Sequence, residues 1–166
     1  MYQGIKLPDF DQIRQYERIA NKEGSGITDK DLRGIWRFQY VWKNGKSDFD
    51  NISSSLLQVL SAKLELFKPE LQYENSNLEI RNSVQFGLFT IIFVGHAFLK
   101  GNRPLLSFKF NYVYFKVGSL NLFKRKVKNI NLKNGPFFSL VAIDKDQKWL
   151  CARGKGGGLA IWIKEK

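Results

Sequence analysis

Apolar side chains near the amino terminus recur every three or four residues, which is typical of an amphipathic helix. Pro8 and Asp9 provide a start signal for this helix, and the glycines of residues 24–26 end it. Thr28 with Asp31 three residues later predicts a capping arrangement for a short turn that follows. The predicted inward face of the helix consists of Phe10, Ile13, Tyr16 and Ala20, and the predicted outward face consists of Arg14, Glu17 and Arg18.

From residue 35 onward the spacing of apolar residues changes to a period of two, which indicates β-strands. In the segment 35–42, Trp36, Phe38, Tyr40 and Trp42 alternate with other residues, so we expect all four on one inward face. The clearest strand is 106–115, where Leu106, Phe108, Phe110, Tyr112 and Tyr114 alternate over ten residues. Further strands are expected within 53–67, whose spacing also fits a helix, and at 77–84, 89–99, 139–143, 148–152 and 159–164.

No long helical pattern follows the first predicted strand, so parallel βαβ units are not expected. The predicted fold is mainly β, an antiparallel barrel with an amino-terminal α-helix. We divide it into a helical segment, residues 1–30, that packs on or plugs the barrel, and a barrel domain, residues 31–166. The length of 166 residues suits a single domain.

Two short sequence motifs, one near each end of the chain, predict how this barrel closes. Gly34 stands two residues before Trp36, and Arg153 with Gly154 and Gly157 precedes the last strand. A guanidinium group can stack on an indole ring and donate to nearby carbonyl groups. Because lipocalin-type barrels close one end in this way, we expect Arg153 to lie on Trp36 in a lipocalin-like (calycin) barrel.

Composition supports a β-rich container more than it supports a catalyst. Aromatic residues make up 14% of the chain, with 14 phenylalanines, which suits a barrel interior. Cys151 is the only cysteine, so the chain has no internal disulfide and no cysteine metal cluster, and a reducing compartment is the simpler assumption. His96, the only histidine, lies in an apolar run and is interpreted as a core or rim residue.

The positive net charge of the chain predicts an anionic partner but does not identify its chemical class. There are 27 lysine and arginine residues against 15 aspartate and glutamate residues, a net charge of +12. Nucleic acid, anionic lipid headgroups, an acidic protein and no dedicated partner all fit this charge. We expect a basic loop, and most such loops are simply solvated; contact with a headgroup layer is the alternative, because Leu120, Leu122 and Phe123 stand beside its cations. Those cations are Lys124, Arg125, Lys126 and Lys128, with Lys133 nearby.

No catalytic or nucleotide-binding arrangement emerges from the sequence. The glycines of 154–158 lack the order of a phosphate-binding loop and predict a hairpin turn instead. Carboxylates fall in turns, where they usually cap a turn; they are Asp48, Asp50, Asp144 and Asp146. Only His96 and Asp146 are candidates for acid–base chemistry, and no RNP-type segment supports RNA binding by the exposed aromatics of the long strand.

The first ten residues lack the apolar run of a secretory signal, and the longest apolar stretch, 86–99, is broken by glycines and His96. We therefore expect a protein that is not secreted and that contacts membranes only peripherally.

The segment LSFKFNYVYFKVG at 106–118 and the segment IDKDQKWLCARGKGGGLAIWI at 143–163 resemble the plastid lipid-associated proteins, or fibrillins. The resemblance extends over about residues 32–163 and includes the pattern of Gly34, Trp36, Phe38 and Tyr40, the pair Phe108 and Phe110, and the turn with Arg153, Gly154 and Gly157. The sequence departs from the family at Val41, Trp42 and Ala160, so ligand choice is not carried over. Plant members also carry a transit peptide, and its absence is expected of a cyanobacterial or mature form.

The resemblance implies a lipocalin-like barrel that holds isoprenoid lipids, such as a carotenoid or a prenylquinone, at or near thylakoid membranes or plastoglobules, without enzymatic activity. The predicted ligand-binding residues are Trp36, Phe38, Tyr40, Phe108, Phe110 and Tyr112. Two alternatives of other classes stay open, a basic nucleic-acid-binding module and a barrel-type enzyme or chromophore chaperone.

Overall fold

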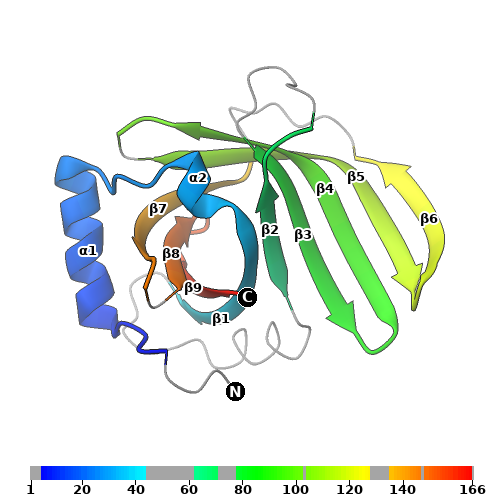
Figure 1. Cartoon of the computed structure of the whole chain (residues 1–166), viewed down its shortest axis with the longest axis horizontal. Helices are drawn as coiled ribbons and strands as arrows, with labels where there is room; N and C mark the ends of the chain where they lie inside the picture. The colour runs from blue at the N-terminus through cyan, green and yellow to red at the C-terminus, as the bar shows by residue number, and fades with distance from the viewer. Residues whose placement is uncertain are drawn as a thin grey trace.

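The computed structural model describes residues 5–43, 62–70, 78–102, 104–127, 135–146 and 148–165. Within these residues the chain is mainly β, with two short helices and one antiparallel sheet of nine strands (Figure 1). The helices are α1 (Phe10–Glu23) and α2 (Asp29–Leu32), and the strands are β1 (Gly34–Trp42), β2 (Lys63–Phe67), β3 (Leu78–Phe86), β4 (Phe89–Lys100), β5 (Leu105–Val117), β6 (Leu120–Lys126), β7 (Phe137–Asp144), β8 (Trp149–Gly154) and β9 (Leu159–Lys164).

The sheet curls into a partly closed ring. Its strand order is β4-β3-β2-β1-β9-β8-β7-β5-β6, and β4 pairs with β5 as well, which joins the order to itself. Strand β5 allows this because it pairs with β4 along its length, while its other edge pairs first with β7 at residues 105–107 and then with β6 at residues 112–117.

Part of the sheet extends beyond the ring, to the right in Figure 1. We call this part the outlying sheet; it comprises residues 82–86 of β3, 89–94 of β4, 112–117 of β5 and all of β6. Its strands end in two hairpin turns on the side of the molecule away from α1.

The two faces of the sheet bury two hydrophobic clusters. Inside the ring, Trp36, Leu66, Ile80 and Leu106 are almost fully buried in the larger cluster, to which α2 adds Leu32. The outer face of β1, β7, β8 and β9 carries the smaller cluster, which α1 covers. Members of the smaller cluster are Ile13, Trp42, Val141, Trp149, Cys151, Leu159 and Ile161.

Helix α1 lies outside the ring, so it flanks the ring and does not plug it (Figure 1). Asp9 caps its start by accepting from the backbone N–H of Gln12 at 2.8 Å, and Gln12 in return accepts from the Asp9 N–H at 3.0 Å. The helix ends at Gly24, with φ at 87°. A side chain at Gly24 would collide with the carbonyl oxygen of Asn102 in the β4–β5 turn, 2.2 Å from the Cβ position.

Most of the predicted strands are present, with shifted ends, and the capping box of Thr28 and Asp31 is confirmed. The expected hairpin turn at 154–158 is also confirmed, because the Gly157 N–H donates to the Gly154 carbonyl at 2.9 Å. The expected basic loop is wrong for Lys124, Arg125 and Lys126, which lie in β6. Predictions for Asp48, Asp50, Lys128, Lys133 and a strand within 53–61 concern residues outside the described ranges.

Candidate functional site

Four of the six predicted ligand-binding residues share the inner face of the ring. Trp36, Phe38 and Phe108 are buried there, and Phe110 packs against them. Phe38, Phe108 and Phe110 contact other aromatic rings of the same face, and together these rings form a continuous series. The ring centroids are 6.3 Å apart for Phe38–Trp162, 5.4 Å for Phe138–Trp162, 5.1 Å for Phe108–Phe138 and 5.4 Å for Phe108–Phe110.

The other two predicted residues, Tyr40 and Tyr112, do not follow the alternation. A register shift between Phe38 and Tyr40 pairs Tyr40 with Ile161 of the outer cluster, and Trp42 is buried in that cluster against Phe10. The expectation that Trp36, Phe38, Tyr40 and Trp42 face inward together is therefore wrong. A β-bulge inserts an extra residue, which moves every later side chain to the opposite face.

A second register shift affects β5. Gly95 pairs with Phe110 and Val94 pairs with Tyr112, so Asn111 is the extra residue. Tyr112 and Tyr114 consequently lie on the outer face, and Val113, Phe115 and Val117 take the inner face. The bulge thus replaces tyrosines by fully apolar side chains on the inner face of the outlying sheet.

The inner face of the outlying sheet continues the aromatic series out of the ring. Phe93 of β4 lies 5.4 Å from Phe110, and farther out Phe115 stacks on Phe123 of β6 at 4.2 Å. Unlike Trp36, Phe38 and Phe108 inside the ring, these side chains are half-buried or exposed. The apolar residues of this face are Val84, Phe86, Phe89, Ile91, Phe93, Val113, Phe115, Val117, Leu120 and Phe123.

A single alternation along the long strand does not predict most of this surface. The alternation of Phe89, Ile91 and Phe93 in the strand before it was a usable signal. Their register partners Val117, Phe115 and Val113 cannot be found by extending the spacing of Phe108 and Phe110. The bulge at Asn111 separates the two patterns.

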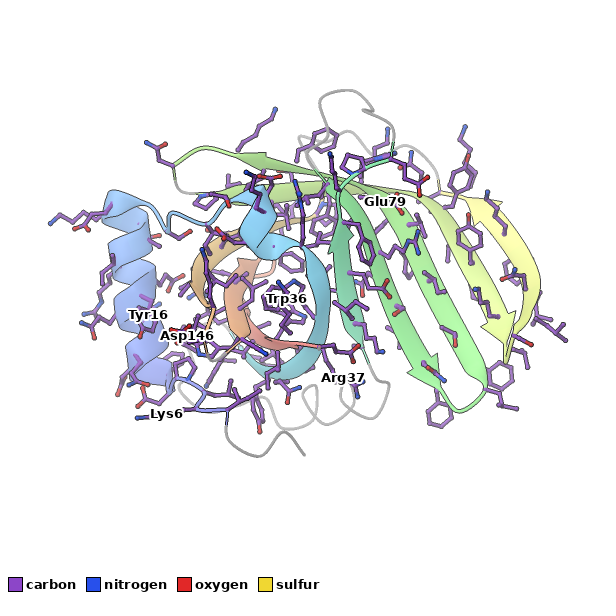
Figure 2. The ribbon with its side chains drawn as sticks, viewed as in Figure 1. Lys6, Tyr16, Trp36, Arg37, Glu79 and Asp146 are labelled. Atoms are coloured by element: carbon purple, nitrogen blue, oxygen red, sulfur yellow. The ribbon has the colours of Figure 1, made fainter. Side chains whose placement is uncertain are left out.

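The predicted closure of the ring by Arg153 on Trp36 is wrong. Trp36 pairs with Lys164 and Arg153 pairs with Leu159, so the two residues lie beside opposite ends of β9, and those ends are about 16 Å apart at the usual rise of a strand. The cation over the indole of Trp36 is the Lys164 ammonium, 5.1 Å from the ring centroid. The indole N–H donates to the Leu32 carbonyl of α2 at 2.7 Å, within the ring (Figure 2). A salt bridge between Lys145 and Asp31, at 2.7 Å, holds α2 and lowers the pKa of Asp31 to about 2.

Arg153 instead ties the ring to α1. Its guanidinium donates to both carboxylate oxygens of Glu17, one at 2.7 Å, and to the carbonyl oxygen of Gly157. The hydrogen bond from Arg153 lowers the pKa of Glu17, against the effect of burial, and Glu17 raises the pKa of Arg153 in return. Glu17 is 8% exposed, which corrects its placement on the outward face of the helix. Gly154 and Gly157 shape the turn that presents Arg153.

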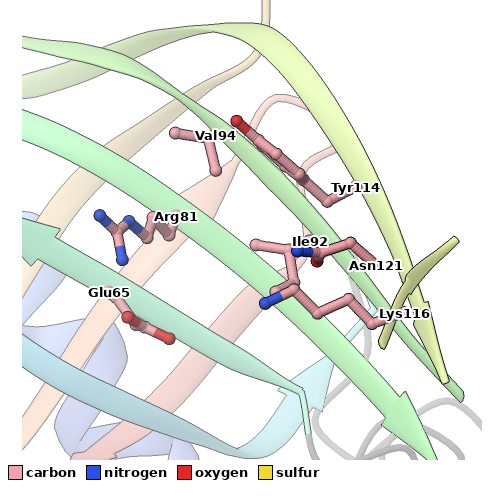
Figure 3. Close-up of a pocket in the computed structure, with 7 residues that line it drawn as sticks. All are labelled: Glu65, Arg81, Ile92, Val94, Tyr114, Lys116 and Asn121. Carbon is pink, nitrogen blue, oxygen red and sulfur yellow. The ribbon is translucent and has the colours of Figure 1, made fainter. Parts of the chain in front are cut away.

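The outer face of the outlying sheet carries a pocket of about 300 Å³ (Figure 3). Tyr114 lines it, and the Lys124 ammonium lies 4.0 Å from the ring centroid of Tyr112 and 5.3 Å from that of Tyr114. Of the predicted anion contacts, Lys124, Arg125 and Lys126 are exposed on β6. The pocket is lined by Glu65, Arg81, Ile92, Val94, Tyr114, Lys116 and Asn121.

The two candidates for acid–base chemistry lie on separate elements. His96 is on β4, paired with Lys109, and Asp146 is exposed in the β7–β8 turn (Figure 2). The side chain of Asp144 accepts from the Asp146 N–H at 2.9 Å, so Asp144 caps that turn as predicted. Among the described residues no cluster of three histidine, cysteine or acidic side chains is able to hold a metal ion.

Neither helix of the described chain has the length and apolar character that crossing a bilayer requires. Comparisons with protein-family models, with curated proteins and with solved structures find no match. The resemblance to the fibrillins therefore stays a prediction.

Proposed function

We propose that this chain binds an isoprenoid-type lipid, such as a prenylquinone or a carotenoid, without acting on it. The ligand lies along the inner face of the outlying sheet, where the ring opens. In this proposal the ring is an incompletely closed lipocalin-like barrel, and the resemblance of the sequence to the fibrillins supports that assignment and the choice of ligand class.

One observation carries the proposal: the aromatic series leaves the buried core and continues onto a half-buried surface. Inside the ring the aromatic rings contact one another, as Phe38 and Phe138 do with Trp162. Beyond Phe110 the inner face is still apolar, yet its side chains are no longer fully buried. A long apolar molecule laid on this face would remove that surface from water, which is favourable by about 25 cal/mol per Å².

The location differs from the one predicted from the sequence. Trp36, Phe38 and Phe108 are buried core residues inside the ring and are not proposed to contact the ligand, and Phe110 lies at the edge of the proposed site. Tyr40 and Tyr112 have no place in it, because both bulges turn them outward. The residues proposed to contact the ligand are Ile91, Phe93, Val113, Phe115 and Phe123.

Titration of the purified chain with a prenylquinone tests the proposal. Quinones quench tryptophan fluorescence at short range, and Trp162 is connected to the site through Phe138 and Phe108. We expect saturable quenching at one quinone per chain. Phe115→Ser removes one ring from the site and should weaken binding about tenfold, by the transfer free energy of part of a phenylalanine side chain.

Tyr114→Ser is the matched control, because Tyr114 is the next residue on the same strand and faces the outer pocket. Binding that Tyr114→Ser abolishes and Phe115→Ser leaves intact would place the lipid in the outer pocket and overturn the site. An absence of saturable uptake of both a prenylquinone and a carotenoid would overturn the proposed function.

A basic nucleic-acid-binding module is the second candidate, favoured by tyrosines and cations on the outer face. Tyr112 and Tyr114 would offer stacking surfaces for bases. Lys124 already lies over Tyr112, at 4.0 Å, so a base would have to displace it. Binding of single-stranded RNA that persists at physiological salt and is lost in Tyr112→Ser would support this candidate, whereas binding lost at moderate salt would reflect charge alone.

A further inference from the structure

Among the described residues, the large apolar side chains with the highest exposed fractions lie at the two hairpin turns of the outlying sheet. Leu88 is 68% exposed in the β3–β4 turn, and Leu120 is 69% exposed after the β5–β6 turn. Turn positions are usually polar, because exposing a large apolar side chain gains nothing in water. The other members of this group are Phe86, Phe89, Leu122 and Phe123, each more than half exposed.

The two turns are alike and are joined. Gly87 and Gly118 both have positive φ, 57° and 55°, and each stands directly after an apolar residue that pairs across its hairpin. The Gly118 N–H donates to the Leu88 carbonyl at 2.8 Å, which links the two hairpins side by side. We call the six exposed apolar residues on them the twin tip.

Backbone hydrogen bonding limits how deeply the twin tip is able to enter an apolar phase. Phe86 pairs with Phe89 and Val117 pairs with Leu120, so ladder hydrogen bonds extend to both turns. Entry into lipid is costly mainly for backbone groups that have no such partners. Strand β6 is the edge of the described sheet and is paired there with β5 alone, so the tip suits the polar interface of a bilayer and not its hydrocarbon centre.

Exposed cations follow the tip along β6, and the sequence segment that builds the tip has no acidic residue. Between Glu79 and Asp144 the sequence has ten lysine or arginine residues and no aspartate or glutamate. Lys124, Arg125 and Lys126 are exposed on β6, directly behind Leu122 and Phe123. Apolar side chains at the tip and cations behind them match an anionic bilayer, which has an apolar interior and negatively charged headgroups.

We propose that the twin tip inserts into the interface of an anionic lipid bilayer, with the lysines and arginine of β6 on the headgroups. This orientation places the open inner face of the outlying sheet next to the lipid phase. The inference stands on exposure and charge, and it holds whether or not the inner face binds a prenylquinone.

Vesicle co-sedimentation of the full chain tests the proposal. We expect binding to vesicles of phosphatidylcholine mixed with phosphatidylglycerol and weak binding to phosphatidylcholine alone. Leu88→Ser combined with Leu120→Ser should weaken partitioning at least tenfold, since two exposed side chains no longer leave water. Ile19→Ser is the control, because Ile19 is 44% exposed on α1, away from the tip.

Fluorescence quenching by brominated lipids measures insertion depth and is a second test. The four native tryptophans, Trp36, Trp42, Trp149 and Trp162, are at most 7% exposed, so Leu88→Trp adds the one indole that reaches the bilayer. Brominated lipids should quench the fluorescence of Leu88→Trp and leave Ile19→Trp unquenched. Equal quenching in both variants, or in neither, would overturn the proposal.

Other occupants of the tip give different results. A second copy of this chain would appear as a dimer in sedimentation that the double serine variant dissociates, and that result would overturn the proposal. Vesicle binding that moderate salt abolishes and the double variant leaves unchanged would be due to charge alone, and would also overturn it. Phe115→Ser should lower quinone uptake and spare vesicle binding, so failure of the tip and failure of the lipid site are separable.

Discussion

The ion pair between Glu17 and Arg153 fastens α1 to the ring, and Arg153→Met should remove about 2 kcal/mol of stability. The side chains are 10% and 22% exposed, between the surface pairs that contribute about 0–1 kcal/mol and the buried pairs whose disruption costs about 3–5 kcal/mol. After the substitution Glu17 stays buried and keeps only Arg14, whose side chain is 46% exposed. Most of the expected loss is the cost of that poorly compensated carboxylate.

Thermal unfolding followed by circular dichroism measures this loss. For a chain of this size about 2 kcal/mol corresponds to a drop in Tm of about 4–8 °C. Replacing both partners, as Glu17→Leu with Arg153→Met, should restore much of the difference, because no charge is then left buried. A drop in Tm below about 1 °C for Arg153→Met, or a double variant no more stable than the single one, would refute the reasoning.

The same pair gives a pH dependence with a definite sign. The pKa of Glu17 is lowered in the folded chain from 4.5, so its stabilising contribution is present above about pH 4.5 and is lost as the pH falls through the lower folded value. The stability difference between the wild type and Glu17→Gln should therefore shrink as the solution is acidified below pH 4.5. A difference that stays constant or grows over this range would contradict the lowered pKa.

Three further predictions concern other parts of the fold. Gly95→Ala should destabilise the chain by about 3 kcal/mol in urea unfolding, because the new Cβ would lie 1.9 Å from a backbone carbonyl oxygen of β5. The control is Gly87→Ala, which should cost only about 1 kcal/mol, because Gly87 lies in open space and only its φ of 57° is unfavourable. Asp31→Asn should lower stability by about 1 kcal/mol at neutral pH through loss of the cap and of the bond to Lys145, and this difference should vanish as the pH falls from about 4 to about 2. The thiol of Cys151 is fully buried and burial raises its pKa, so it should react with a thiol reagent only as fast as the chain opens, and a fast reaction in native buffer would contradict its placement.

The sequence predicts the local elements well where one regular pattern persists. The capping signals of Asp9 and Thr28 are short-range hydrogen-bonding chemistry, and both caps form. The predicted last strand, 159–164, has the bounds of β9. The glycines at 154–158 indicate a turn, in which Gly157 has φ at 84°, an angle that few other residues adopt. Each of these signals lies within about five residues of its effect.

The site depends on relations over longer distances, and there the sequence is insufficient. Asn111 gives no local sign that it is an extra residue in β5, since its register is set by β4 on the other side of a turn. Arg153 is attracted to Glu17, which is 136 residues away, and a helical wheel alone places Glu17 in solvent. A motif-based expectation paired Arg153 with Trp36, yet strand register puts them beside opposite ends of β9.

The bulges in β1 and β5 explain why one curled sheet has both a buried core inside the ring and an open apolar face on the outlying sheet. In β1 the bulge after Phe38 turns Trp42 onto α1, so the outer surface there is buried by a helix. In β5 the bulge at Asn111 keeps Phe110 toward the core and puts Phe115 on the same inner face farther out. Without this second bulge, Tyr112, Tyr114 and Lys116 would line the inner face and interrupt its apolar surface. The extra residue at Asn111 is thus the feature on which the proposed lipid site depends most directly.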